Sequence, residues 1–267
     1  MKLHYLHVIV PQGEEAHAKK ESLFQELLVN LQNIIKNKVI SLEYFGFDQY
    51  TYCYIIVPDD LLETVEGLFY SSYPDCDIRR TKDYTLKFHP ESQAIAGTTL
   101  KFRFRDVYSA KSYDDFAEDS QSNLFSVVSK IATNEQVWVQ VVINPKEESA
   151  WYHFSRNWAM RFARWRQFFH IRDRMRAKSE EGIHEKRKKI AQAKYALEPY
   201  DAVIRCAYIA KDAPTAKRKL EAVLNSLYQL NATDIQEFIA SGTTTGPGFA
   251  ELYRKRSISG SSIMGVK

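Results

Sequence analysis

The sequence of 267 residues contains little of what marks specialised protein classes: three cysteines, ten glycines, eight prolines and no long apolar run. The cysteines form no CxxC pair, which argues against a disulfide framework or a zinc site and favours a reducing compartment. No stretch approaches the roughly 18 consecutive apolar residues of a membrane span. We therefore expect a globular protein in the cytoplasm, either soluble or bound peripherally at the inner face of the membrane.

Common catalytic motifs are also missing. There is no G-x-S-x-G or H-E-x-x-H. His4 and His7, three residues apart on a predicted strand, point to opposite faces and cannot chelate one metal together. Segment 260–267 fails as a phosphate-binding loop because Lys267 lies one position late and no Ser or Thr follows it. We expect no enzymatic activity, no cofactor and no metal, and we expect residues 241–267 to form a flexible tail.

Positive charge is concentrated in one part of the chain. Residues 156–194 hold thirteen Lys and Arg against four Asp and Glu, a net charge of +9; the whole chain carries +4, so the remainder carries −5. This asymmetry predicts an electrostatic partner for the segment. The candidate contact residues are Arg156, Arg161, Arg164, Arg166, Arg172, Arg174, Lys186, Arg187, Lys188 and Lys189.

Aromatic side chains recur every three or four residues in the same segment, the spacing of one helix face. They are Trp151, Phe154, Trp158, Phe162, Trp165 and Phe169. Three interpretations remain open. The rings can pack on a second helix at about 183–197, with the cations solvated. They can also lie at the headgroup boundary of an anionic membrane surface, or the segment can contact DNA through its phosphates.

The order of predicted strands and helices, taken from the spacing of apolar residues, predicts the fold. The order β-α-β-β-α-β occurs twice, and the length favours about two domains. The first copy comprises strands at 3–10, 39–47, 50–57 and 76–88 and helices at 14–36 and from 58 to about 73, the latter with Asp59 or Asp60 as its cap. The second comprises strands at 100–108, 137–143, 202–209 and 232–239 and helices at 123–132 and from Asp212, its cap, with Pro214 in the first turn.

These repeats predict an α+β protein of two tandem ferredoxin-like (βαββαβ) domains. The first domain is expected at 1–92 and the second at 93–240. A basic helical-hairpin insertion at about 146–198 separates the middle strands of the second domain.

Another strand alternates cations and rings from Lys101 to Arg105. Phe102 and Phe104 therefore share one face of the strand. RNA-binding ferredoxin-like domains stack bases on such rings. This strand lacks the glycines of their signature, so a place in the core is favoured for both rings.

Several segments together resemble one region of a known family. They are Glu43 on a strand, Tyr-Ile-Ile-Val-Pro at 54–58, Val-Glu-Gly at 65–67, Tyr-Pro-Asp-Cys-Asp-Ile at 73–78, Trp-Val-Gln-Val-Val-Ile-Asn-Pro at 138–145, and a helix at 216–230 leading into Asn231. Over most of residues 1–240, the chain resembles the region that precedes the motor in DNA-transfer ATPases of type IV secretion and conjugation systems, the coupling-protein-like family. No motor segment follows in this sequence, so no ATPase activity is expected of it.

The resemblance implies a non-enzymatic docking or assembly module. Its partner would be a motor ATPase or another component of secretion or conjugation. Two further functions come from the basic segment itself: a free-standing nucleic-acid-binding protein, or an adaptor on an anionic membrane surface. A second copy of the chain, in a homo-oligomer, is another expected partner.

Overall fold

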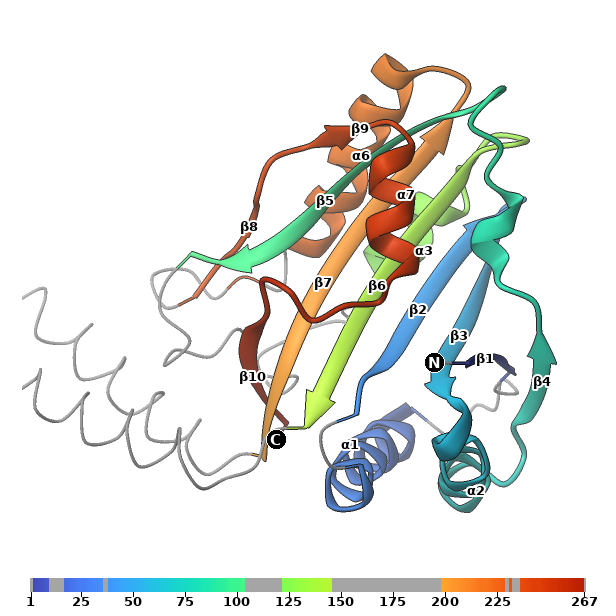
Figure 1. Ribbon diagram of the computed structural model, residues 1–267, viewed down its shortest axis with the longest axis vertical. Coiled ribbons are helices and arrows are strands. Elements are labelled where there is room, and N and C mark those ends of the chain that lie inside the picture. Colours follow the sequence, from blue (N-terminus) through green and yellow to red (C-terminus); the bar gives the residue numbers. More distant parts are fainter. Residues whose placement is uncertain are drawn as a thin grey trace, which may run out of the picture.

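One antiparallel sheet organises the molecule in the computed structural model, which describes residues 2–9, 17–35, 38–103, 122–145, 198–228, 231 and 236–266. The strands of this part of the chain follow the order β4-β1-β3-β2-β6-β7-β5-β8, with β10 beside β7 and β9 beside β5 (Figure 1). They are β1 (Leu3–Ile9), β2 (Ile40–Phe47), β3 (Tyr50–Pro58), β4 (Asp77–Thr81), β5 (Ala94–Phe102), β6 (Gln136–Pro145), β7 (Glu198–Ala210), β8 (Phe238–Ala240), β9 (Thr244–Thr245) and β10 (Ser262–Val266).

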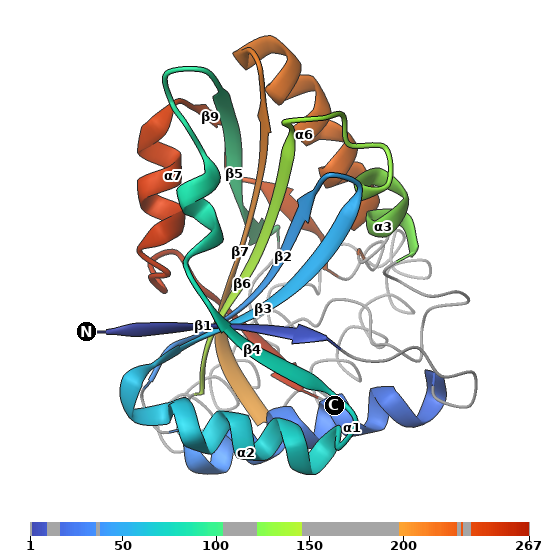
Figure 2. The same ribbon diagram turned by 90° about the vertical axis from the view of Figure 1, so that its right-hand side faces the viewer.

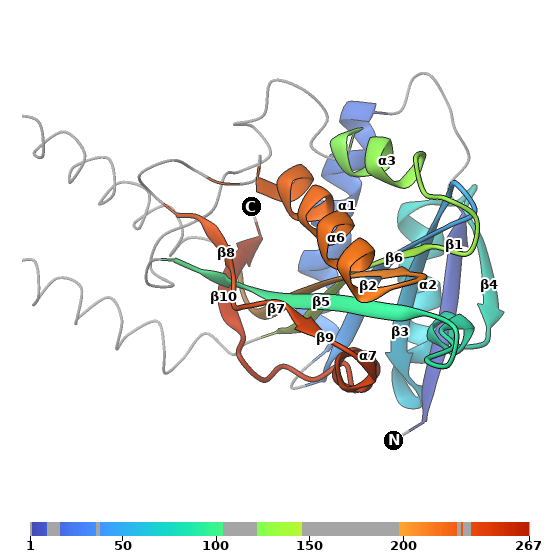
Figure 3. The same cartoon turned by 90° about the horizontal axis from the view of Figure 1, so that it is seen from above.

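Helices cover the two faces of this sheet unequally. Four of the described helices pack on one face and α7 packs on the other (Figures 2 and 3). They are α1 (His17–Ile34) and α2 (Leu62–Ser72) over the first half, α3 (Ser122–Val128) and α6 (Ala213–Leu227) over the second half, and α7 (Pro247–Arg254) opposite them. We call the face under the four helices the helical face and the other the open face. No described helix is both long and apolar enough to cross a membrane.

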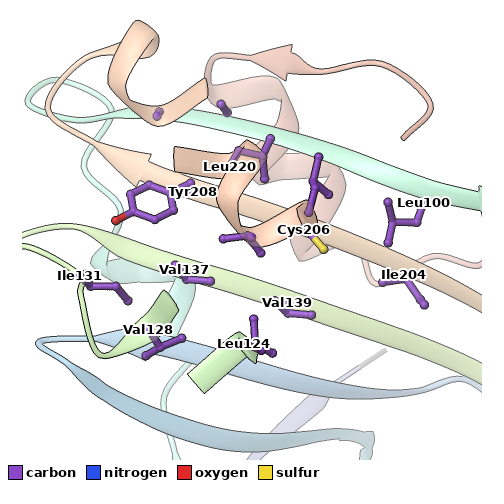
Figure 4. Close-up of a cluster of buried hydrophobic side chains, with 14 of the residues drawn as sticks. Leu100, Leu124, Val128, Ile131, Val137, Val139, Ile204, Cys206, Tyr208 and Leu220 are labelled. Atoms are coloured by element: carbon purple, nitrogen blue, oxygen red, sulfur yellow. The ribbon is translucent and has the colours of Figure 1, made fainter. Parts of the chain in front are cut away.

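The helical face holds two hydrophobic clusters, one under each pair of helices. In the second half, Leu220 of α6 and Leu124 of α3 lie over Val137, Val139 and Cys206 of the sheet (Figure 4). Alternation along the strands sends their other side chains to the open face. A third cluster, rich in aromatic rings, forms there. The central strands β2, β3, β6 and β7 thus contribute to two layers of core.

The predicted α+β class is confirmed, but the strands do not separate into two sheets. β2 pairs with β6 over eight residues, from Ile40 opposite Ile143 to Phe47 opposite Gln136. With β9 and β10 added, this sheet is larger than two four-stranded ferredoxin-like sheets. The strand order is nevertheless regular. From the outer edge to the β2–β6 junction, the order is β4-β1-β3-β2 in the first half and β8-β5-β7-β6 in the second, so the first to fourth strands of each half occupy the same positions.

Two local predictions are confirmed. β2 and β3 form a hairpin whose two turn residues, Asp48 and Gln49, both have positive φ, at 51° and 67°. Such φ values match a turn that follows the natural twist of paired strands. Asp212 caps α6, where its Oδ1 accepts a hydrogen bond of 2.8 Å from the backbone N–H of Thr215, and Pro214 lies in the first turn.

Other local predictions are wrong. Asp59 and Asp60 lie in a 3-10 helix, η1 (Asp59–Leu61), and neither side chain caps α2. Asp59 instead accepts from Nε2 of His4 at 2.5 Å. The strand predicted at 76–88 ends at Thr81 and is followed by a second 3-10 helix, η2 (Tyr84–Lys87). The Asp83 carboxylate caps η2 and so favours a local turn over continued strand pairing.

Strand limits differ as well. β5 begins at Ala94 rather than at 100, and β8 is the short strand Phe238–Ala240. The predicted positions 104–108 and 232–235 lie outside the described residues.

The expected flexible tail is also wrong for residues 241–266, which fold onto the sheet. Pro247 starts α7, and Phe249, Ala250 and Tyr253 form its buried face. Gly97 of β5 makes room for this helix: a Cβ placed there would lie 2.1 Å from the Phe249 ring. The C-terminal segment is therefore part of the core.

Candidate functional site

The contact residues predicted in the basic segment, and the aromatic residues predicted beside them, lie outside the described residues. The structure shows where the segment is attached. β6 ends at Pro145 and β7 begins at Glu198, and the two strands pair there with Pro145 opposite Tyr200 (Figure 1). The insertion predicted at about 146–198 thus separates two neighbouring strands, although Glu198 itself belongs to β7.

A row of polar side chains crosses the centre of the sheet on its open face. Glu43 of β2 lies opposite Gln140 of β6, which lies opposite Arg205 of β7. All three are buried; Glu43 is 2% exposed and Arg205 is 1% exposed. Since buried polar groups need partners, their hydrogen bonds define the most unusual site in the described structure.

The Glu43 carboxylate is the centre of this site. Its Oε1 accepts from Ser41 Oγ at 2.7 Å and from Gln140 Nε2 at 2.8 Å. Its Oε2 accepts from the Tyr84 hydroxyl at 2.7 Å. Arg256 donates to both oxygens, through Nε at 2.9 Å and Nη2 at 3.3 Å. Both oxygens are thus held by neighbouring groups, and the negative charge is paired.

Arg256 links the C-terminal segment to two acidic groups. Besides Glu43 it donates to both oxygens of Asp83 at 3.3 Å. Burial opposes the charged form of each partner. The ion pairs outweigh this effect, raising the pKa of Arg256 and, with hydrogen bonds from Thr85, lowering the pKa of Asp83. The guanidinium also lies 5.0 Å from the ring centre of Tyr5, whose pKa burial raises to about 12.

Arg205 is the second buried cation of the site. Its Nη1 donates to Gln140 Oε1 at 2.8 Å and its Nη2 to the Ser257 carbonyl at 2.5 Å. Burial lowers the pKa of Arg205, and the nearby Glu43 charge opposes that shift. Two carboxylates, Glu43 and Asp83, thus face two guanidiniums in one connected network.

Two tyrosines complete the network. The hydroxyls of Tyr84 and Tyr253 lie 2.9 Å apart, and the Tyr253 carbonyl accepts from Gln140 Nε2 at 3.0 Å. Burial raises the pKa of both phenols, which keeps them neutral. We call Glu43, Asp83, Tyr84, Gln140, Arg205, Tyr253 and Arg256 the buried network.

The buried network joins parts of the chain that are far apart in sequence. It contains residues from β2, β6 and β7, from η2, and from α7 and the turn after it. No group of three or more metal-binding side chains occurs among the described residues. The hydrogen bonds of Glu43 therefore give the network a positioning role: it fastens the C-terminal segment across the β2–β6 junction.

A smaller polar cluster lies at the start of β6. Glu135 accepts from the Tyr208 hydroxyl at 2.6 Å and pairs with Lys219 of α6. Burial alone would raise the pKa of Glu135, but these partners lower it. The cluster connects the turn before β6 with β7 and α6.

The stacking role considered for Phe102 is not favoured by its surroundings. Phe102 packs on the helical face, with its ring centre 5.1 Å from that of Phe238. The preferred interpretation, a core residue, agrees with this position. Phe104 lies outside the described residues.

Sequence reasoning missed the buried network as a site. A signal was present, because Glu43, Gln140 and Arg205 each interrupt an apolar strand. Polar residues in such positions need buried partners.

Neither a protein-family model nor a curated protein matches this chain. The resemblance to the coupling-protein-like family stays a prediction.

Proposed function

We propose that this chain is a non-enzymatic docking or assembly module of a DNA-transfer machinery of the type IV secretion or conjugation kind. The observation that carries the proposal is the single sheet, joined across β2 and β6 and fastened by the buried network. Such a sheet is a rigid platform that can hold a partner in a fixed orientation. The partner is a motor ATPase or another component of the same machinery.

The fold proposal is a fused pair of ferredoxin-like units. Its support is the equal strand order of the halves, β4-β1-β3-β2 and β8-β5-β7-β6, with two helices on the same face of each. In this arrangement β2 and β6 are equivalent edge strands that pair with each other. The basic segment occupies the place of the second unit's hairpin turn.

The basic segment supports a second candidate function, binding of DNA or of an anionic membrane surface. Its charge of +9 is the supporting observation. Phosphate contacts weaken steeply with salt, whereas aromatic rings inserted at a lipid surface retain part of their affinity. Titrating the protein with duplex DNA and with anionic vesicles over a range of salt concentrations separates the two.

Replacing Arg161, Arg164 and Arg166 by Gln tests this second function. We expect a folded protein that has lost binding to DNA or to anionic vesicles, because exposed charges contribute little to stability. A triple variant that binds both as well as the parent would show that these cations are only solvated.

The main proposal is tested with a motor ATPase encoded beside the gene. We expect the purified chain to form a defined complex with that motor in analytical ultracentrifugation, and to bind no ATP in calorimetry with magnesium. Saturable micromolar ATP binding by the chain alone would contradict the non-enzymatic role. Absence of a complex with the motor would contradict the docking role.

A further inference from the structure

The open face of the first half carries a surface of aromatic side chains. His7 of β1, Tyr52 and Tyr50 of β3 and Phe47 of β2 alternate onto this face, away from α1 and α2. Tyr50 is 67% exposed, and the other three are partly exposed. We call these four residues the aromatic face.

Three rings of the aromatic face, those of His7, Tyr52 and Phe47, form a connected strip through buried Phe45. The ring centre of His7 lies 5.5 Å from that of Tyr52, which lies 5.8 Å from Phe45. Phe45 stacks on Phe47 at 5.7 Å with an interplanar angle of 10°. Contacts with the buried ring hold Tyr52 and Phe47 in place, so this part of the surface is ordered before any ligand arrives.

A cation accompanies these rings. The Lys87 ammonium lies 4.4 Å from the ring centre of Phe47. Lys87 is exposed and forms no ion pair within the described part of the chain. Arg79, opposite His7, is paired with Asp77.

The composition of this surface favours one kind of partner. Flat rings with polar edges beside an unpaired ammonium group match a strand of bases and phosphates, because bases stack on aromatic rings whatever their sequence. An aliphatic protein surface would leave Lys87 unpaired. Burial and the neighbouring Arg79 lower the pKa of His7, so its ring is neutral near pH 7.

We propose that the aromatic face binds single-stranded DNA, with bases stacked on Tyr52 and His7 and a phosphate near Lys87. The choice of DNA rather than RNA rests on the proposed function, in which DNA is the cargo. This surface is separate from the attachment of the basic segment. Phe47 pairs with Gln136 at the start of β6, whereas the segment leaves from Pro145 at its end.

The test uses the full chain and a fluorescein-labelled oligothymidylate of about 20 nucleotides, longer than the footprint of a single sheet. Tyr52→Leu keeps an apolar side chain but removes the flat ring. We expect it to weaken binding roughly tenfold in fluorescence anisotropy. Tyr70→Leu is the matched control, since Tyr70 is an exposed tyrosine of α2 on the helical side. Urea unfolding of each variant confirms that it is folded.

Salt dependence tests the phosphate contacts. Lys87→Gln should reduce the slope of log affinity against log salt by about 0.7, the value for one single-strand phosphate contact. Lys217→Gln, on the exposed side of α6, should leave it unchanged. An oligonucleotide carrying 5-iodouracil should crosslink under ultraviolet light to a peptide from β1 or β3. The crosslink should persist in the triple arginine variant.

Three results would overturn the inference: no binding of single-stranded DNA by the parent, unchanged binding by Tyr52→Leu, or equal loss with Tyr70→Leu. Tighter binding of the matching RNA would overturn the assignment to DNA. Complex formation with the motor is measured without DNA. Failure of the proposed function is therefore distinguishable from failure of this inference.

Discussion

The open face differs between the two halves of the sheet, although their strand orders are equivalent. In the second half α7 lies on this face, with Phe249 against Gly97 and buried Ile95 and Ile209 nearby. In the first half η2 covers part of it, while His7 and the neighbouring tyrosines stay partly exposed. The open face of the second half is therefore packed under α7, whereas part of the open face of the first half is accessible to solvent.

Side-chain size accounts for this difference. Gly97 of β5 pairs with Ala207 of β7, so the side chains at this place under α7 are small. The equivalent strands of the first half, β1 and β3, carry large rings, including Tyr5 and Tyr54. A helix packs closely only where the strands leave room for its side chains. Gly97 and Ala207 thus leave room for α7 in the second half, whereas Tyr5 and Tyr54 occupy the equivalent strands of the first half.

The largest loss of stability is expected from Glu43→Ala, which removes the centre of the buried network at the junction of the two halves. It leaves Arg256 buried with only Asp83, so stability should fall by about 3–5 kcal/mol. Urea unfolding measures the change. Glu66→Ala, which removes the carboxylate that pairs with the exposed Arg80, is the control and should cost about 1 kcal/mol or less. Similar losses in both variants would contradict a special role for Glu43.

The next effect compares the two open faces directly. Phe249→Ala removes a buried ring from the covered half and should cost about 3–5 kcal/mol. Tyr52→Ala removes a partly exposed ring from the accessible half and should cost about 1 kcal/mol. The thermal midpoints of both variants measure this difference. Equal losses would mean that the two faces are used alike.

A smaller loss of stability is expected at acidic pH. The pKa of Asp83 is lowered in the folded protein by Arg256, so its stabilisation is present above the unfolded value near 4 and is lost as pH falls through the folded value. In Asp83→Asn, the midpoint of urea unfolding should decrease less than in the parent as the pH falls below about 4. Glu135→Gln should do the same in the second half, because its pKa is also lowered. If Asp83→Asn keeps the full acid dependence, the ion pair with Arg256 is not the cause.

The smallest loss of stability is expected when the long connection between β6 and β7 is replaced by a short turn like the one between β2 and β3. β2 and β3 are joined by a two-residue turn, whereas residues 146–197 separate β6 from β7. Deleting 146–198 and joining Pro145 to Pro199 through a short Gly-Ser loop should leave a cooperative thermal transition, because the strands already pair there. Loss of that transition would show that the basic segment is part of the core.

The sequence predicted those elements whose signals are local. The hairpin at Asp48 and the cap at Asp212 follow from short patterns. The pairing of β6 with β7 follows instead from the repeated order of strands and helices. Pairing of β2 with β6 was not predicted, because any two apolar edge strands could pair and no nearby residue selects the partner. The C-terminal helix was missed although Pro247 and the spacing of Phe249 and Tyr253 favour it.

The candidate sites show the same limit. Glu43 is conspicuous within its strand, but its partner Arg256 lies 213 residues later and no spacing rule connects them. The aromatic face likewise combines His7 of β1 with rings of β2 and β3, which only the register brings together. Strand alternation predicts which rings share a face of one strand, not which face a helix will cover.

The distance between Glu43 and Arg256 has a consequence for synthesis in the cell. Translation adds roughly 5–20 residues per second, so about 10–40 s pass between the emergence of the carboxylate and that of its cation. During this interval the first four strands can pair, but the Glu43 carboxylate on β2, the edge strand of this half, does not yet have the Arg256 guanidinium beside it. Ribosome-bound chains that lack the turn after α7 should therefore stay sensitive to protease and depend on chaperones, and protection should arise in one step when Arg256 emerges.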